Sequence, residues 1–231
     1  MGSLDLFTVA VGGAEPPPAA WLAVLDEEER QRAQRLRRPA DRRVFVAAHA
    51  LKRLALAEAL AVAEPTALRF AAGPHGKPSL PTDPDLHFSL SHTHGLAALA
   101  LGRSGPLGVD AEAIDPALDT DDLARSLFTD AEIAGLARDS DRVRGFYRLW
   151  TAKEAVLKAE GLGLSLPLAE VTIDDTHARG PSGGWRLWRH EPSPRHLLTL
   201  AWAGTRTLLV SRHALDADPL LTLWAQRASH A

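Results

Sequence analysis

The sequence predicts an α+β protein, a pseudo-dimer of two similar halves with helices packed on a small antiparallel sheet in each. Helical segments and groups of short strands occur in blocks, and this block pattern repeats loosely after Ile114. The 231 residues are 45% hydrophobic and 24% charged, which suits one core or two small ones. We therefore expect an N-terminal half, residues 1–113, and a C-terminal half, residues 114–231, that pack directly on each other.

The N-terminal half starts with the alternating segment LDLFTVAV, which is typical of a strand. Helical periodicity, interrupted before Pro39, indicates two helices, and a turn region rich in Pro and Gly separates them from three short apolar strands. The expected elements are a strand at 4–11, helices at 21–37 and 41–63, a strand at 68–73, and antiparallel strands at 86–92, 96–102 and 107–112.

The C-terminal half repeats this order, with helical segments first and alternating apolar segments after them. The expected elements are helices at 120–127, 130–137 and 142–160, strands at 170–174, 184–190, 196–204 and 205–211, and a last helix at 219–227.

The composition argues against several classes of protein. The net charge of −3 does not favour nucleic-acid binding, and the absence of cysteine excludes disulfides and thiolate metal sites. We find no signal peptide and no apolar run long enough for a membrane span. The sequence thus predicts a cytoplasmic protein without a membrane partner.

Two acidic residues lie two positions apart at the end of an apolar strand, in GVDAE. Alternation along the strand places Asp110 and Glu112 on one face, where they repel each other unless a cation lies between them. An oxygen-ligated cation such as Mg²⁺ suits this pair. On its own, D-x-E is also typical of two surface acids.

The helix expected at 142–160 places Trp150, Glu154 and Lys158 on one face. Glu154 and Lys158 could form an ordinary i,i+4 surface ion pair. Trp150 should be buried, however, which puts Glu154 at the rim of the core as a possible third metal ligand or general base. Only four of the 26 basic residues are lysines, and two of these, Lys153 and Lys158, flank Glu154.

Three further motifs carry groups that could bind anions. HGKPSL lacks the glycine spacing of a phosphate-binding P-loop, although Lys77 could still place a charge on a phosphate. Ser91 and His92 could bind an anion; we regard a zinc site as unsupported, and a serine-hydrolase elbow is missing. Seven arginines between residues 30 and 43 could bind nucleic acid or form a solvated helix face: Arg30, Arg32, Arg35, Arg37, Arg38, Arg42 and Arg43.

Together these motifs indicate a substrate with several phosphates. They also resemble the motifs of a known family. GVDAE, followed about forty residues later by WTAKEAVLKAEGLGL, is similar to the signature pair of the Sfp-type 4′-phosphopantetheinyl transferases. GKP and FSLSH stand upstream in the expected order, and RRVFVAAHALKR resembles the family's basic helix. The family often has a larger apolar residue at Ala111, which should point away from the metal.

The resemblance implies Mg²⁺-dependent transfer of the 4′-phosphopantetheine arm of coenzyme A to a serine of an apo acyl or peptidyl carrier protein, releasing adenosine 3′,5′-bisphosphate. It implies that Asp110, Glu112 and Glu154 hold Mg²⁺ and that Glu154 and Lys158 are catalytic. The implied coenzyme A contacts are Arg43, Arg53, Lys77, Ser91, His92, Asp110 and Lys158. The family's two-half form also suits a monomer.

Two other hypotheses stay open at this point: a non-catalytic nucleic-acid module using the arginines, and a different Mg²⁺-dependent phosphodiester enzyme on the same site. The sequence does not identify the carrier protein or its pathway, which could be fatty-acid, polyketide or nonribosomal peptide synthesis. The role of Lys153 is also open.

Overall fold

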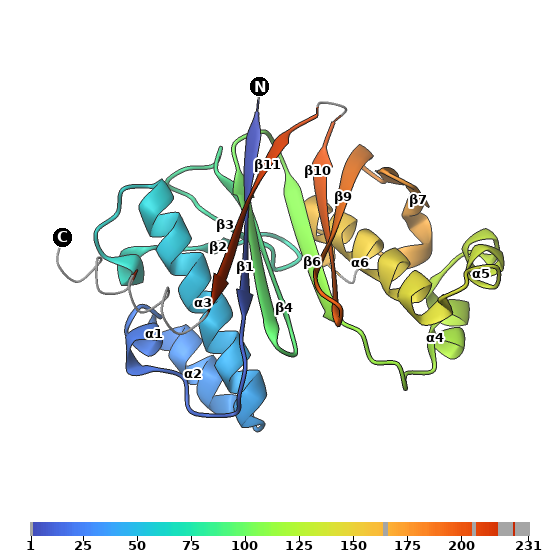
Figure 1. Cartoon of the computed structure of the whole chain (residues 1–231). Coiled ribbons are helices and arrows are strands. Elements are labelled where there is room, and N and C mark those ends of the chain that lie inside the picture. Colours follow the sequence, from blue (N-terminus) through green and yellow to red (C-terminus); the bar gives the residue numbers. More distant parts are fainter. Residues whose placement is uncertain (1, 164–165, 205–206, 217–223, 225–231) are drawn as a thin grey trace.

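The computed structural model describes residues 2–163, 166–204, 207–216 and 224, and these form four layers in the order helix, sheet, sheet, helix (Figure 1). The N-terminal sheet contains, in order, β11 (Leu209–Asp216), β1 (Ser3–Ala10), β5 (Leu96–Gly102) and β4 (His87–Thr93). The C-terminal sheet contains β6 (Leu107–Ala113), β10 (His196–Ala203), β9 (Gly183–Ser193), β8 (His177–Gly180) and β7 (Thr172–Asp174). Helix α3 (Pro39–Ala59) packs on the first sheet and α6 (Arg142–Glu160) on the second. The α+β class is confirmed.

Two strands depart from the predicted arrangement. The strands predicted at 96–102 and 107–112 do not pair with each other, because β6 joins the C-terminal sheet beside β10. The N-terminal sheet is not purely antiparallel either, since β11 returns from the far end of the chain and pairs with β1 in parallel. The division at residue 113 and the likeness of the halves stay predictions, and the chain crosses between the sheets on both sides of that boundary.

Strand β5 shows why the sequence LAALALG is apolar throughout. Its seven residues are all buried, because α3 covers one face of the strand and the C-terminal sheet covers the other. Leu99 packs into the core beneath α3, whereas Leu96 packs with β6 and β10 residues between the two sheets. Alternation along a strand with two covered faces thus leaves no polar side.

The helix predicted at 21–37 is wrong in one respect, because it is two helices, α1 (Ala19–Ala23) and α2 (Glu27–Arg35). Asp26 begins the second one. Its carboxylate accepts a hydrogen bond from the Glu29 amide at 2.9 Å, and the Glu29 side chain accepts one from the Asp26 amide at 3.2 Å. This capping box satisfies two amides that a helix start leaves free.

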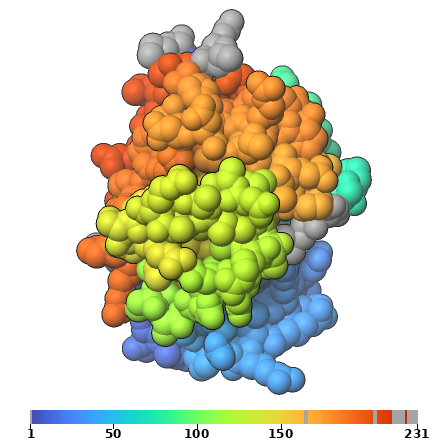
Figure 2. Space-filling model, turned by 90° about the vertical axis from the view of Figure 1, so that its right-hand side faces the viewer, coloured from blue at the N-terminus to red at the C-terminus, as the bar shows by residue number. Residues whose placement is uncertain are grey.

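The remaining helices follow the sequence prediction closely. Helices α4 (Thr120–Leu127) and α5 (Asp130–Leu136) precede α6 and lie on the outer face that Figure 2 shows in yellow-green. A short β2–β3 pair (Ala71–Ala72, Pro78–Ser79) replaces most of the strand predicted at 68–73, and β8 was not predicted.

The helix predicted at 219–227 lies, except for residue 224, outside the described residues. In the described ranges, none of the helices combines the length and apolar character that crossing a bilayer requires.

A buried ion network joins α2 to α3. The Glu29 carboxylate accepts hydrogen bonds from Lys52 Nζ at 2.7 Å and from Arg53 Nε, and it lies 2.8 Å from His49 Nδ1. Burial alone would raise the pKa of Glu29. The hydrogen bond from His49 and the charge of Lys52 outweigh burial and hold this pKa well below 4.5.

We predict that Glu29→Gln lowers the free energy of unfolding by about 3 kcal/mol at pH 7, because it leaves buried cations without their counter-charge. The folded-state pKa of Glu29 is depressed, so its stabilisation is present above the unfolded pKa and is lost as the pH falls through the folded value. Urea unfolding between pH 7 and pH 3 should therefore show a difference that shrinks on acidification. A difference that is constant across this range would contradict the prediction.

Candidate active site beside β6 and α6

Strand β6 packs against α6 with almost no space between the two backbones. A Cβ atom on Gly108 would lie 2.1 Å from the Ala155 carbonyl oxygen and 2.5 Å from the Ala159 amide nitrogen. Glycine is therefore required at this position. Because side chains alternate along a strand, Asp110 and Glu112 lie on the same face as Gly108, beside α6.

Gly108→Ala is expected to lower the free energy of unfolding by about 1–3 kcal/mol, because the new methyl group collides with helix backbone and forces β6 and α6 apart. Gly135→Ala is the matched control. Its Cβ would enter open space within α5, so this change should stabilise the protein by up to about 1 kcal/mol. Equal effects of the two substitutions in chemical denaturation would contradict the close approach.

Asp110 is the most buried acid of the site, with 3% of its surface exposed. Its Oδ1 atom accepts hydrogen bonds from Lys158 Nζ at 2.6 Å and from Ser91 Oγ at 3.0 Å. Its Oδ2 atom is buried and has no hydrogen-bond partner. One half of the carboxylate is thus held in place and the other half is open to a further ligand.

Glu112 lies two residues further along the same face. Its carboxylate accepts hydrogen bonds from Trp150 Nε1 at 3.2 Å and from Thr93 Oγ1 at 3.3 Å. Burial and the negative charge of Asp110 raise the pKa of Glu112 to about 7. A bound cation would offset the negative charge of Asp110 and favour the ionised form of Glu112.

Glu154 comes from α6 and completes the acidic group. Its Oε1 atom is buried without a hydrogen-bond partner, and burial together with the charge of Asp110 raises its pKa. Unpartnered carboxylate oxygens on Asp110 and Glu154 fit a hard cation. Among the described residues, however, no three His, Asp or Glu side chains are gathered closely enough to hold a metal as they stand. The chemistry of the set fits Mg²⁺, and the three-ligand arrangement is not preassembled.

Lys158 pairs with a different acid from the one that its spacing suggested. Its ammonium group forms its ion pair with Asp110 rather than with Glu154, and it also donates to Ser91 Oγ at 3.0 Å. The side chain keeps 31% of its surface exposed. Lys158 therefore stands at the edge of the site, with a charge available to a ligand.

Ser91 and His92 point to different sides of β4. Ser91 faces β6 and its hydroxyl is bonded to Asp110. The His92 ring lies edge-on to Phe45 of α3, with 6.0 Å between ring centroids. Desolvation and the positive charges of neighbouring basic groups lower the pKa of His92; the groups are His49, Lys158 and Arg32. Only Ser91 is thus in contact with the carboxylates.

Three of the predicted coenzyme A contacts bond to the protein itself. Lys77 Nζ donates to the carbonyls of Leu107 at 3.0 Å and Ala159 at 2.9 Å, and it caps the end of α6. Arg43 is buried and donates to carbonyls of the loop after β1, those of Gly12, Glu15 and Pro16. Arg53 is fully buried and bonds to Asp26, Glu29, Pro65 and Leu68. The structure does not bring Arg43 or Arg53 to the site carboxylates, those of Asp110, Glu112 and Glu154.

Lys153, whose role the sequence left open, is fully buried. Its ammonium donates to the carbonyls of Leu168 at 2.9 Å and Val171 at 2.7 Å, and it forms an ion pair with Glu132 at 2.9 Å. It thus joins α6 to α5 and to the 3-10 helix Leu168–Glu170. No local signal could have shown this, because the partners come from two other segments.

Three of the seven arginines near α2 donate to carbonyls of the chain itself. Arg30 and Arg42 donate to the carbonyls of Leu25 and Leu36, and Arg43 is buried. Internal hydrogen bonds thus use three of the seven predicted cations. This arrangement does not favour the nucleic-acid hypothesis.

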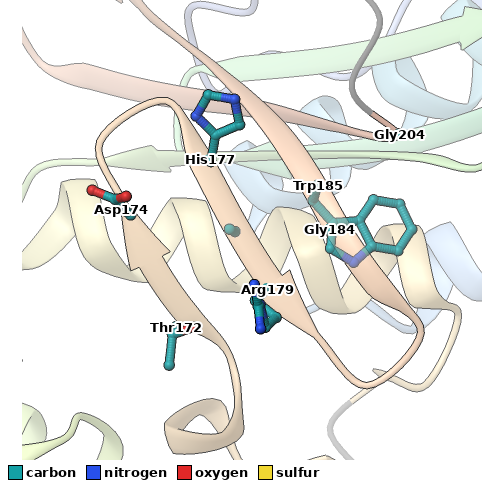
Figure 3. A pocket seen from close by; sticks show the side chains of 8 residues that line it. Thr172, Asp174, His177, Arg179, Gly184, Trp185 and Gly204 are labelled. Carbon is teal, nitrogen blue, oxygen red and sulfur yellow. The ribbon is translucent and has the colours of Figure 1, made fainter.

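The candidate site lies between two pockets. One of about 220 Å³ is lined by Lys158, Lys77 and Ser89 among others, and one of about 940 Å³ is lined by Thr93, His94 and Ala113 among others. A third, of about 260 Å³, lies on the C-terminal sheet around Arg179 and Trp185 and contains none of the predicted site residues (Figure 3). The site carboxylates line none of these three pockets, whereas Lys158 lines the first and Thr93, which bonds to Glu112, lines the second.

The fold and the site define an α+β protein with a centre of acids and a lysine where β6 packs against α6. The comparisons with known proteins identify the family to which such a protein belongs. The family model described as the 4′-phosphopantetheinyl transferase superfamily matches residues 106–210. A 4′-phosphopantetheinyl transferase of Bacillus subtilis is 34% identical over 161 residues, covering 68% of this chain and 70% of the relative. The 4′-phosphopantetheinyl transferase HetI of Nostoc sp. is 33% identical over 190 residues, covering 79% of this chain and 80% of the relative.

The matched segment contains β6 and α6, the two elements that carry the acidic group. The chain belongs to the 4′-phosphopantetheinyl transferase superfamily and is an enzyme of this class. The resemblance seen in GVDAE and WTAKEAVLKAEGLGL is confirmed.

Proposed function

We propose that this enzyme transfers the 4′-phosphopantetheine arm of coenzyme A to a serine of an apo acyl or peptidyl carrier protein and releases adenosine 3′,5′-bisphosphate. The observation that carries the proposal is the meeting of Asp110, Glu154 and Lys158 where β6 packs against α6, in a member of this family. Lys158 lines one pocket and Thr93, which bonds to Glu112, lines a larger one, and two such pockets suit a reaction with two substrates.

Asp110, Glu112 and Glu154 would hold Mg²⁺, and the unpartnered oxygens of Asp110 and Glu154 support this assignment. When bound, the ion neutralises charge on the pyrophosphate and polarises it for attack. Lys158 would add a second positive charge at the leaving bisphosphate, which is the main requirement of phosphoryl transfer.

Glu154 would take the proton of the carrier serine, directly or through a water. Burial raises the pKa of Glu154 and makes it a better base than an exposed carboxylate. The serine oxygen then bonds to the phosphorus next to pantetheine, and the bond from that phosphorus to the bisphosphate breaks.

Of the coenzyme A contacts predicted from the sequence, we keep Lys158, which lines a pocket, and His92, which lies among basic groups. Arg43 and Arg53 would have to give up internal hydrogen bonds to reach coenzyme A, because their guanidinium groups are buried in contacts with the chain itself. Lys77 lines the same pocket as Lys158, but its amine would have to leave two carbonyls to reach a phosphate. The monomeric state stays a prediction from the sequence.

The test is incubation with coenzyme A, Mg²⁺ and apo carrier proteins from fatty-acid, polyketide and nonribosomal peptide synthesis. The proposal expects one carrier to gain the mass of the arm while adenosine 3′,5′-bisphosphate appears in equal amount. Cleavage of coenzyme A with no carrier modified would favour the other Mg²⁺-dependent phosphodiester enzyme. A panel left unmodified, with coenzyme A intact, would refute the transferase proposal.

A further inference from the structure

Three hydroxyl groups on β4 connect the two sheets. They belong to alternate residues, Ser89, Ser91 and Thr93, which we call the hydroxyl row. The hydroxyl row accepts hydrogen bonds from amides of β6: Val109 N to Ser89 Oγ at 3.0 Å, Ala111 N to Ser91 Oγ at 3.2 Å and Ala113 N to Thr93 Oγ1 at 3.1 Å. Strands β4 and β6 are the facing edges of their sheets (Figure 1). Side-chain hydroxyls thus do here what backbone carbonyls do within a sheet.

Two members of the hydroxyl row also hold the carboxylates of the candidate site. Ser91 Oγ donates to Asp110 Oδ1 at 3.0 Å, and Thr93 Oγ1 donates to Glu112 Oε2 at 3.3 Å. Each hydroxyl therefore bonds to one acid and to the amide that follows this acid. Ser89 has no acid to hold, because the equivalent residue is Gly108, where the α6 backbone leaves no room for a side chain.

The bonding capacity of Ser91 is fully used. A serine hydroxyl has one hydrogen to donate and two lone pairs. Ser91 donates to Asp110 and accepts from the Ala111 amide and from Lys158 Nζ, and 6% of its surface is exposed. To bind a phosphate group, as the sequence predicted, it would have to give up one of these three bonds. Its contacts instead fix the position of Asp110 relative to Lys158.

We propose that Ser91 and Thr93 are positioning residues that orient Asp110 and Glu112 for the cation. This inference rests on the proposed function, since it concerns the acids assigned to Mg²⁺. With Oδ1 of Asp110 held by Ser91 and Lys158, the unpartnered Oδ2 is the atom left for a metal. Hydrogen bonds of this kind keep a ligand in its binding orientation before the metal arrives.

The experiment measures Mn²⁺ binding to the whole protein by the loss of the free-ion EPR signal, with Mn²⁺ alone as the probe. Ser91→Ala and Thr93→Val remove one hydroxyl each and should weaken Mn²⁺ binding about tenfold or more. Ser89→Ala is the matched control, since it loses the same kind of amide bond but no carboxylate contact. Its Mn²⁺ affinity should stay within about twofold of wild type, and Thr93→Ser should restore binding.

A purely structural role would give a different result. All three deletions would then lower the unfolding temperature similarly and leave Mn²⁺ binding at the level of Ser89→Ala, which would overturn the inference. The Asp110→Asn variant distinguishes a failure of the positioning role from a failure of the proposed metal site. If Asp110→Asn loses Mn²⁺ while Ser91→Ala and Thr93→Val keep it, only the positioning role fails. If Asp110→Asn also binds Mn²⁺ like wild type, both the metal assignment and the positioning role fail.

Discussion

Glu154→Gln is expected to slow phosphopantetheine transfer by about 10²–10⁴-fold, the range for loss of a general base. The amide has nearly the shape of the carboxylate, but it cannot take a proton and it binds a hard cation poorly. Because Glu154 Oε1 has no partner in the folded protein, the substitution breaks no hydrogen bond at that atom. Single-turnover mass spectrometry of a carrier protein measures the rate, and thermal unfolding checks the fold.

Glu160→Gln is the control for this prediction, because Glu160 is the other acid of α6. Its carboxylate accepts hydrogen bonds from the Ser182 amide at 3.1 Å and from Trp185 Nε1 at 3.0 Å, both on the side of β9. We expect the Glu160 variant to keep a rate within a few-fold of wild type. A Glu154→Gln enzyme with full activity would remove Glu154 from both proposed roles, as base and as metal ligand.

Lys153→Met is expected to lower the free energy of unfolding by about 3–5 kcal/mol, the cost of leaving one partner of a buried ion pair alone. Methionine keeps the volume of the lysine stem. It leaves the Glu132 carboxylate and the carbonyls of Leu168 and Val171 without their donor. Urea denaturation at neutral pH measures this loss of unfolding free energy. The substitution leaves Lys158, the other lysine of the motif, unchanged.

Arg142→Ala provides the comparison on the same helix. The Arg142–Asp121 ion pair spans 2.8 Å, and both side chains are about half exposed, so solvent screens the pair. Its removal should cost no more than about 1 kcal/mol. If Lys153→Met costs as little as Arg142→Ala, the buried ammonium does not hold α5 and α6 together in the way the contacts indicate.

The sequence could predict which face carries each acid but could not predict how the two elements meet. Alternation correctly placed Asp110 and Glu112 on one face, and helical spacing placed Glu154 and Lys158 on another. Their contact depends on the close approach of β6 and α6 at Gly108, which is a tertiary event. A glycine inside an apolar strand was the available signal, because such a glycine often marks a close backbone neighbour.

The lysines also show that the sequence could not predict contacts between distant segments. Their scarcity suggested ligand binding, yet Lys52, Lys77 and Lys153 bond to the protein itself. A long side chain can reach a carbonyl or carboxylate from a distant segment, and neither composition nor spacing identifies that segment. Asp26 and Glu29, in contrast, form a capping box whose D-x-x-E pattern is visible in the sequence, so the start of α2 could have been predicted.

The parallel pairing of β1 with β11 has a consequence for synthesis of the chain. Residues 3–10 leave the ribosome long before their register partners, residues 209–216. The first sheet therefore stays one strand short until nearly all of the described chain has emerged. Pairings so distant in sequence are slow to form, since a long loop must close before any contact compensates for the lost entropy. Until then, one edge of β1 is exposed, and a nascent chain is open to mispairing there.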